Sequence, residues 1–186
     1  KDKFIEMLKS FYEYGYVIIE NTKPEENEVI NFAEKIGPVR TTNWGKLFNV
    51  ISKPNPNDLA YTALELKSHS DNPYRKPVPG IQLLHCIANE SSGGDSSLVD
   101  GYSVSKYLEN NYKEYFKVLT ETNVNFKFTD VDVILENKSK IIELDTEGNF
   151  KQISFSGRLD YVPLLENKKL DTFYNARKLM YELCNS

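Results

Sequence analysis

Short β-type stretches separated by glycine and proline turns constrain the fold of this chain more than any other feature. The strongest is 81–88 (IQLLHCIA), which lies between Pro79-Gly80 and Ser92-Gly93-Gly94. Short strands joined by such turns are typical of sandwiches and barrels. The sequence therefore predicts a mainly β fold, a double-stranded β-helix (jelly roll). Further strands are expected at 16–20, 47–52, 59–66, 96–100 and 124–128, with a hairpin at 140–156.

Apolar residues at helical spacing predict helices that flank these strands. The stretches at 4–12 and 29–36 are each followed by a glycine that can end a helix, Gly15 and Gly37. Two more helices are expected within 103–119, and a long amphipathic helix at 170–183. A jelly roll is not expected to stop on a helix. We therefore expect one domain over 1–186 that is truncated at its C-terminus and lacks further strands.

Composition limits the kinds of molecule that this chain is expected to bind. Lys and Arg number 23 and Asp and Glu 27, so the net charge is −4, which argues against nucleic acid and anionic membranes as partners. No apolar run approaches the roughly 20 residues of a membrane span. The two cysteines, Cys86 and Cys184, form no CxxC pair, so a reduced cytoplasmic protein is the default interpretation. A small molecule is the expected partner, and a homodimer stays open.

The motif His69-Ser70-Asp71 is the main candidate for metal chemistry. On an extended backbone residues i and i+2 point to the same side, so the imidazole and the carboxylate can share one ion. Two histidines and one carboxylate on one face leave three positions of Fe(II) open for a keto acid and dioxygen. A surface ion pair is the plainer alternative. His85 is the other histidine, and its apolar stretch favours a buried, hydrogen-bonded core residue over a third ligand, although its reach does not exclude it.

A long block then resembles a known family. Residues 57–104, which contain HSDNPYRKPVPGIQLLHC and GGDSSLVDG, resemble the γ-butyrobetaine and trimethyllysine hydroxylases of the TauD/TfdA superfamily. The resemblance implies a dioxygenase that uses Fe(II), 2-oxoglutarate and O2. It makes His69 and Asp71 the first two metal ligands. The third ligand, a histidine, and an arginine for 2-oxoglutarate lie after the final helix in that family, where no residue of this chain matches them.

The resemblance also assigns the cosubstrate and substrate positions. Ser96 and Leu84 fall at positions that bind 2-oxoglutarate, while Gly93-Gly94 can equally form an ordinary turn. Aromatic faces suit a trimethylammonium group, and Trp44, Phe48 and Tyr61 fall at such cage positions, with core packing as an even alternative for Phe48. The positions that meet the substrate's acid end carry Asp58, Asn72 and Ser156. Asp58 would repel a carboxylate, and it can also be a turn residue.

These observations predict hydroxylation of a C–H bond in a small quaternary-ammonium substrate such as γ-butyrobetaine, the chemistry of carnitine biosynthesis. The same chemistry on trimethyllysine, an aminophosphonate or a taurine-like sulfonate is the first alternative. A basic cluster in the pocket would favour sulfonate or phosphonate. A non-catalytic jelly-roll binding module, or an inactive fragment, is the alternative from another class.

Overall fold

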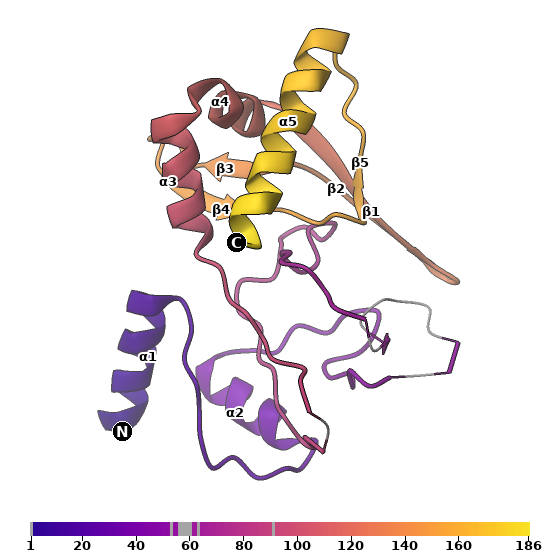
Figure 1. Ribbon diagram of the computed structural model, residues 1–186. Helices are drawn as coiled ribbons and strands as arrows, with labels where there is room; N and C mark the ends of the chain where they lie inside the picture. Colours follow the sequence, from indigo (N-terminus) through magenta and orange to yellow (C-terminus); the bar gives the residue numbers. More distant parts are fainter. Residues whose placement is uncertain (1, 53, 56–60, 63, 91) are drawn as a thin grey trace. The chain divides into compact units, whose positions relative to one another are not determined.

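The computed structural model describes residues 2–52, 54–55, 61–62, 64–90 and 92–186. Two compact units make up the chain. The helical unit consists of Lys1–Phe48 and Leu83–Ser92, and the sheet unit consists of Asn49–Gln82 and Gly93–Ser186. Figure 1 gives the labels of the helices and strands within each unit.

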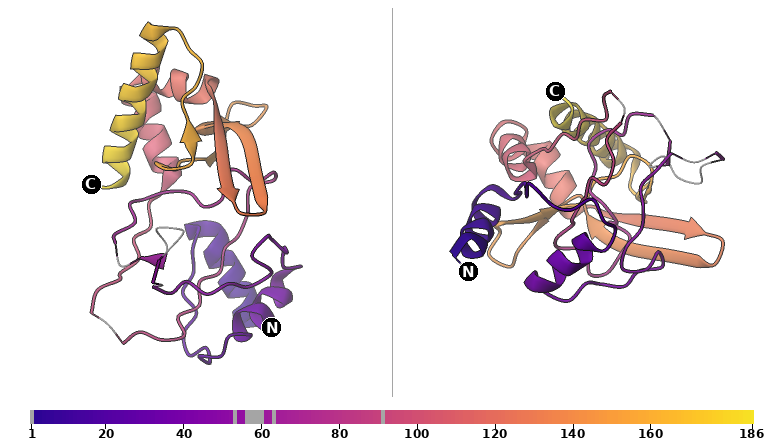
Figure 2. Two further views of the ribbon diagram at one scale, coloured as in Figure 1. Left: turned by 90° about the vertical axis from the view of Figure 1, so that its right-hand side faces the viewer. Right: turned by 90° about the horizontal axis from the view of Figure 1, so that it is seen from below.

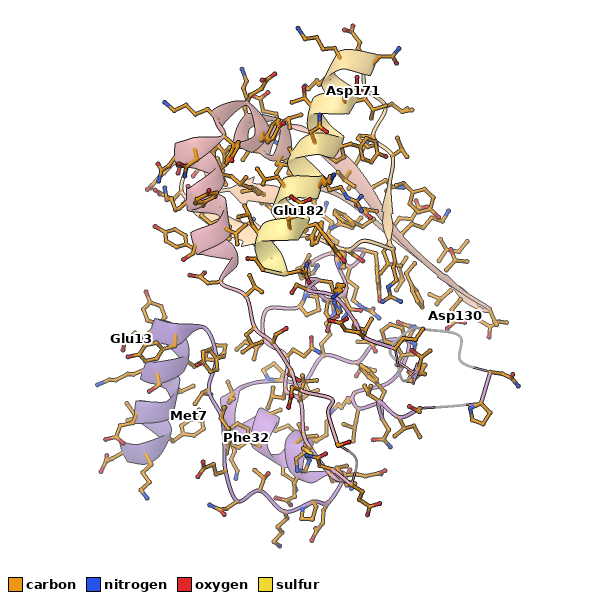
Figure 3. All side chains as sticks on the ribbon, in the orientation of Figure 1. Met7, Glu13, Phe32, Asp130, Asp171 and Glu182 are labelled. Carbon is orange, nitrogen blue, oxygen red and sulfur yellow. The ribbon has the colours of Figure 1, made fainter. Side chains whose placement is uncertain are left out.

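Two amphipathic helices form the helical unit. Helix α1 spans Asp2–Tyr14 and α2 spans Glu28–Ile36, as their apolar spacing predicts. The rings of Phe4 and Phe32 lie 6.5 Å apart in an edge-on contact between the two helices, and Figure 3 labels Phe32 on α2. Gly15 ends α1 with φ +77°, a left-handed conformation that glycine adopts without a steric cost.

The sheet unit contains two small antiparallel sheets. In the first, β1 (Asn123–Asp130) lies between β2 (Val133–Lys140) and the short β5 (Asp160–Tyr161). The second pairs β3 (Ile142–Leu144) with β4 (Phe150–Ile153). Figure 2 shows β1 and β2 as a long ribbon, and Figure 3 labels Asp130 at its tip. The expected hairpin at 140–156 is confirmed by β3 and β4.

Three helices pack over these sheets, namely α3 (Gly101–Asn111), α4 (Lys113–Glu121) and α5 (Asn167–Cys184). Helix α5 buries Phe173, Ala176, Met180 and Cys184, which recur every three or four residues and therefore share one face. Each large side chain of this kind contributes about 1.5–3 kcal/mol when it is buried. The fully buried residues of the sheet unit include Leu108, Leu119, Phe126, Ile141 and Ile142.

Helix α3 begins at a glycine, Gly101, because its first turn lies close to a neighbouring strand. The Asp100 carboxylate caps the helix by accepting a hydrogen bond from the Tyr102 amide at 3.0 Å. A Cβ atom at Gly101 would lie 2.9 Å from Cγ2 of Ile153. Glycine therefore allows the first turn of α3 to approach β4 closely.

Several expected strands do not form. The stretches at 16–20, 47–52, 81–88 and 96–100 are irregular, and their side chains Ile18, Leu84 and Leu98 are 78%, 76% and 70% exposed. An extended segment becomes a strand only when a neighbour accepts and donates its backbone hydrogen bonds. In the described part of the chain, these stretches join neither of the two sheets. The described residues accordingly contain no closed barrel, and of the stretch 59–66, residues 59, 60 and 63 lie outside them.

Candidate functional site

Two serines hold the segment that carries the candidate metal ligands. The Ser68 hydroxyl donates to the Cys184 carbonyl at 2.8 Å, and the Ser68 amide donates to the Asn185 side chain at 3.1 Å, both at the end of α5. The Ser70 amide donates to the Phe155 carbonyl at 2.7 Å, and the Phe155 amide donates back to the Ser70 hydroxyl at 2.7 Å. The segment is thus fastened to two elements far away in the sequence.

His69 and Asp71 alternate with these serines and meet each other. Nε2 of His69 lies 3.2 Å from Oδ1 of Asp71. Nδ1 of the same ring lies 2.7 Å from the Lys67 carbonyl, which can only accept, so Nδ1 must carry a proton. Nε2 then either carries a second proton, or its lone pair faces a carboxylate oxygen and the two atoms repel each other. A proton or a metal cation between the two atoms removes that repulsion.

The electrostatics of the pair agree with this geometry. The hydrogen bond to Asp71 raises the pKa of His69, against the opposing effect of burial. The hydrogen bond to His69 lowers the pKa of Asp71, and the side chain of Gln82 adds to this effect. The charge of Arg158 lowers the pKa of both groups. Without a metal the pair therefore favours imidazolium beside carboxylate, and a metal ion would have to displace that proton.

The donor set fits two positions of a divalent transition metal. Two ligand atoms bound at a right angle about 2.1 Å from one ion are about 3 Å apart, and the observed separation is 3.2 Å. The bond from Nδ1 to the Lys67 carbonyl is the kind of contact that orients a metal-bound imidazole. Among the residues that the structure describes, no cluster of three His, Cys, Asp or Glu side chains is suited to a metal ion. The third protein ligand stays unidentified.

The other polar residues that the resemblance assigns to the site are Asn72, Ser156, Ser96 and Asp58. Asn72 adopts φ +52°, and its side-chain oxygen accepts a hydrogen bond from the Tyr74 hydroxyl at 2.5 Å, so its amide serves the local turn. Ser156 is buried at 3% exposure and lines a cavity together with His69. Ser96 is exposed in the loop before α3. Asp58 lies outside the described residues. The ligand-binding roles of these four residues stay predictions.

Two of the three aromatic cage positions lie together. The rings of Trp44 and Phe48 are 5.5 Å apart and tilted by 50° within the helical unit. A tight turn presents Trp44, since its amide donates to the Thr42 hydroxyl at 3.1 Å. Phe48 is 45% exposed, so it does not serve as a core residue of this unit. Tyr61 belongs to the sheet unit and Leu84 to the helical unit, so the cage of three and the role of Leu84 stay predictions.

The expectation of a hydrogen-bonded His85 is wrong. Both ring nitrogens are buried, and neither has a hydrogen-bond partner among the described residues. The expectation relied on a strand at 81–88, in which alternation would place the ring among neighbouring backbone and side-chain groups. Because that stretch is irregular, those neighbours are not supplied.

A cavity beside His69 contains residues that motif reasoning missed. It has a volume of about 670 Å³ and is lined by 65–69, by 155–158 and by the face of α5 between Tyr174 and Tyr181. Its cationic side chains are Lys67, Arg158, Arg177 and Lys178. The sequence offers one weak signal for Arg158, which follows Ser156 by two residues in a polar turn. The lysine and arginine of α5 show no motif at all.

Comparisons with known proteins agree with the resemblance in the sequence. Residues 1–186 match the family described as "Taurine catabolism dioxygenase TauD, TfdA family". The human gamma-butyrobetaine dioxygenase is 33% identical over 183 residues, which cover 96% of this chain and 47% of that protein. The corresponding protein of Pseudomonas sp. (strain AK-1) is 29% identical over 182 residues, or 98% of this chain and 48% of its own length.

A second group of relatives matches a shorter region. The mitochondrial trimethyllysine dioxygenase of Mus musculus is 32% identical over 123 residues, which cover 66% of this chain and 29% of that protein. The chain spans about half the length of the gamma-butyrobetaine dioxygenases that it matches. Among the described residues, no helix combines the length and the apolar character that a membrane span requires.

Proposed function

Because this chain belongs to the TauD/TfdA family of dioxygenases, we propose that it forms part of an Fe(II)- and 2-oxoglutarate-dependent dioxygenase that hydroxylates a small quaternary-ammonium substrate such as γ-butyrobetaine. The single observation that carries the proposal is the His69–Asp71 pair, whose Nε2 and Oδ1 atoms lie 3.2 Å apart on one face of a fastened segment. The names of the relatives support the class of substrate.

His69 and Asp71 would hold the iron through Nε2 and a carboxylate oxygen. Iron bound there, with 2-oxoglutarate and O2, would supply the oxidising chemistry that an unactivated C–H bond requires. The chain's own contribution is placement. The Lys67 carbonyl keeps the proton of His69 on Nδ1, so Nε2 can bind metal. The hydrogen bond from the Ser70 amide to the Phe155 carbonyl and the one from the Phe155 amide to the Ser70 hydroxyl fix the direction in which both ligands point.

Aromatic side chains would bind the cationic end of the substrate. A trimethylammonium group donates no ordinary hydrogen bonds, is weakly hydrated and is attracted to the faces of aromatic rings. The contact between Trp44 and Phe48 and the exposure of Phe48 support this role. Tyr61 is proposed as the third ring. Ser96 and Leu84 are proposed to contact 2-oxoglutarate, and Asn72 and Ser156 the substrate.

The metal-binding part of the proposal is tested by titrating Fe(II) anaerobically into the purified protein and into Asp71→Ala. Asp132→Ala is the matched control, because Asp132 is an exposed carboxylate in the turn between β1 and β2. Binding that weakens at least tenfold in Asp71→Ala and is unchanged in Asp132→Ala supports the site. Equal binding by all three proteins would contradict it.

The substrate class is tested by 2-oxoglutarate decarboxylation, measured as succinate released with γ-butyrobetaine, trimethyllysine, taurine or an aminophosphonate. Stimulation by the trimethylammonium compounds alone supports the proposal. Stimulation by taurine or the phosphonate alone would contradict it and would assign the alternative class of substrate to this site. Replacing Tyr61 by Ala should weaken γ-butyrobetaine binding by about 1–2 kcal/mol and leave 2-oxoglutarate binding unchanged. Equal losses for both ligands would indicate damage to the fold.

A further inference from the structure

The cavity beside His69 has the size and lining of a small-molecule site. Its volume of about 670 Å³ lies within the range of roughly 300–1,000 Å³ that such sites have. All of its lining residues belong to the sheet unit. Phe155 and Tyr181 form an aromatic wall with ring centroids 6.1 Å apart. The cavity therefore offers contact to an apolar body as well as to charged groups.

The charges at this cavity are strongly unequal. Lys67 pairs with Glu65 at 2.9 Å, and Arg177 pairs with the buried Asp160 at 2.7 Å. Arg158 and Lys178 line the same cavity, and Glu65 is the only carboxylate among the described residues that line it. Cations therefore outnumber carboxylates around the space, and such a basic cluster suits an anionic group, be it a carboxylate, a sulfonate or a phosphonate.

Arg158 also connects the cavity with the metal pair. It lines the same cavity as His69, one member of that pair. The cavity wall itself includes His69 and Ser156. An anionic group in contact with Arg158 would thus share this cavity with His69, with room for the rest of the ligand.

We propose that this cavity receives the carboxylate end of the substrate and that Arg158, with Lys178, determines the preference for that group. The inference rests on the proposed function, and it names the residues that bind the acid end of the substrate. A planar guanidinium matches a carboxylate through two parallel hydrogen bonds. Among the described positions that the resemblance assigns to the acid end, Ser156 lines this cavity and Asn72 does not.

The experiment compares ligands that share a cation and differ in the acid end. Isothermal titration is carried out with γ-butyrobetaine, with its sulfonate analogue and with butyltrimethylammonium, which has no acid. Butyrate, which has the acid and no cation, is titrated as a further probe. The proteins are the wild type, Arg158→Gln, Arg158→Lys, Lys178→Gln and the control Lys169→Gln. Lys169 is an exposed lysine of α5 that does not line the cavity. Thermal melting of each variant verifies that it is folded.

We expect Arg158→Gln to weaken γ-butyrobetaine binding about ten- to hundredfold, the range for hydrogen bonds to a charged group. Lys178→Gln should weaken it less, Arg158→Lys should retain part of the affinity, and Lys169→Gln should have no effect. Butyltrimethylammonium should bind wild type and Arg158→Gln equally. Equal losses for both ligands would overturn the inference, because Arg158 would then act through the fold.

The remaining outcomes separate this inference from the proposed function. If γ-butyrobetaine binds wild type and Arg158→Gln with the same affinity, the inference fails and the proposed function stands. If butyltrimethylammonium does not bind while butyrate binds in an Arg158-dependent manner, the cavity is a carboxylate site and the quaternary-ammonium function fails. Tighter binding of the sulfonate analogue than of γ-butyrobetaine overturns the carboxylate assignment. Binding of none of the probes overturns both.

Discussion

Replacing Ser70 by alanine should loosen the segment that carries the metal pair. The Ser70 hydroxyl accepts from the Phe155 amide at 2.7 Å, and Phe155 is almost fully buried. Alanine leaves that amide without its partner, and an unsatisfied buried donor costs about 1–3 kcal/mol. The backbone bond from the Ser70 amide to the Phe155 carbonyl remains. We therefore expect a loss of about 2 kcal/mol in the free energy of unfolding, with the overall fold retained.

The loss is measured by urea unfolding and by hydrogen exchange of the Phe155 amide, which reports the contact directly. A loss of 2 kcal/mol corresponds to a decrease in melting temperature of about 4–8 °C for a chain of this size. Ser97→Ala is the matched control, since Ser97 is exposed. Ser70→Thr retains a hydroxyl and should restore much of the protection. If Ser70→Ala and Ser97→Ala exchange and unfold alike, the reasoning about this contact is refuted.

Three other changes test different parts of the sheet unit. Asp71→Asn should lower the pKa of His69 towards 6.5, which is measured by NMR titration of the two histidine signals. In wild type, the stabilisation by the His69–Asp71 pair is present below pH 6.5 and is lost as the pH rises through the pKa of His69 in the folded state. Burial raises the pKa of Asp160 above 3.8 despite the neighbouring Arg177. The free energy of unfolding of wild type, relative to Asp160→Asn, should therefore fall as the pH rises through that pKa. A rise would show that the ion pair outweighs burial. Phe126→Ala should cost about 3–5 kcal/mol in urea unfolding, because Phe126 is fully buried; a loss under 1 kcal/mol would contradict its place in the core.

Local patterns predicted the helices and the hairpin at 140–156 well. The apolar spacing at 4–12, 29–36 and 170–183 corresponds to α1, α2 and α5, and the turn at 146–149 lies between β3 and β4. These elements obtain their hydrogen bonds from residues nearby in the sequence. Asp145 illustrates this, since its carboxylate accepts from the amides of Glu147 and Asn149 at 2.9 and 2.8 Å.

The irregular stretches show the limit of the same reasoning. The stretch 81–88 has the strongest β-type composition in the chain, yet it is not a strand. A strand depends on a partner that composition does not specify, because its backbone groups bond across to another segment and not along its own. The environment of His85 was misjudged for the same reason.

The sequence by itself determined the family, the helices, the hairpin at 140–156 and the two residues of the candidate metal pair. His69 and Asp71 share a side because an extended backbone alternates, a local property that spacing alone reveals. Only the tertiary structure decided that Ser68 and Ser70 fasten this segment to α5 and to Phe155, across 116 and 85 residues of chain. Likewise, Arg158 and Lys178 reach one cavity through long-range packing. Such contacts depend on how distant segments bury their apolar faces together, and no pattern within one segment encodes that.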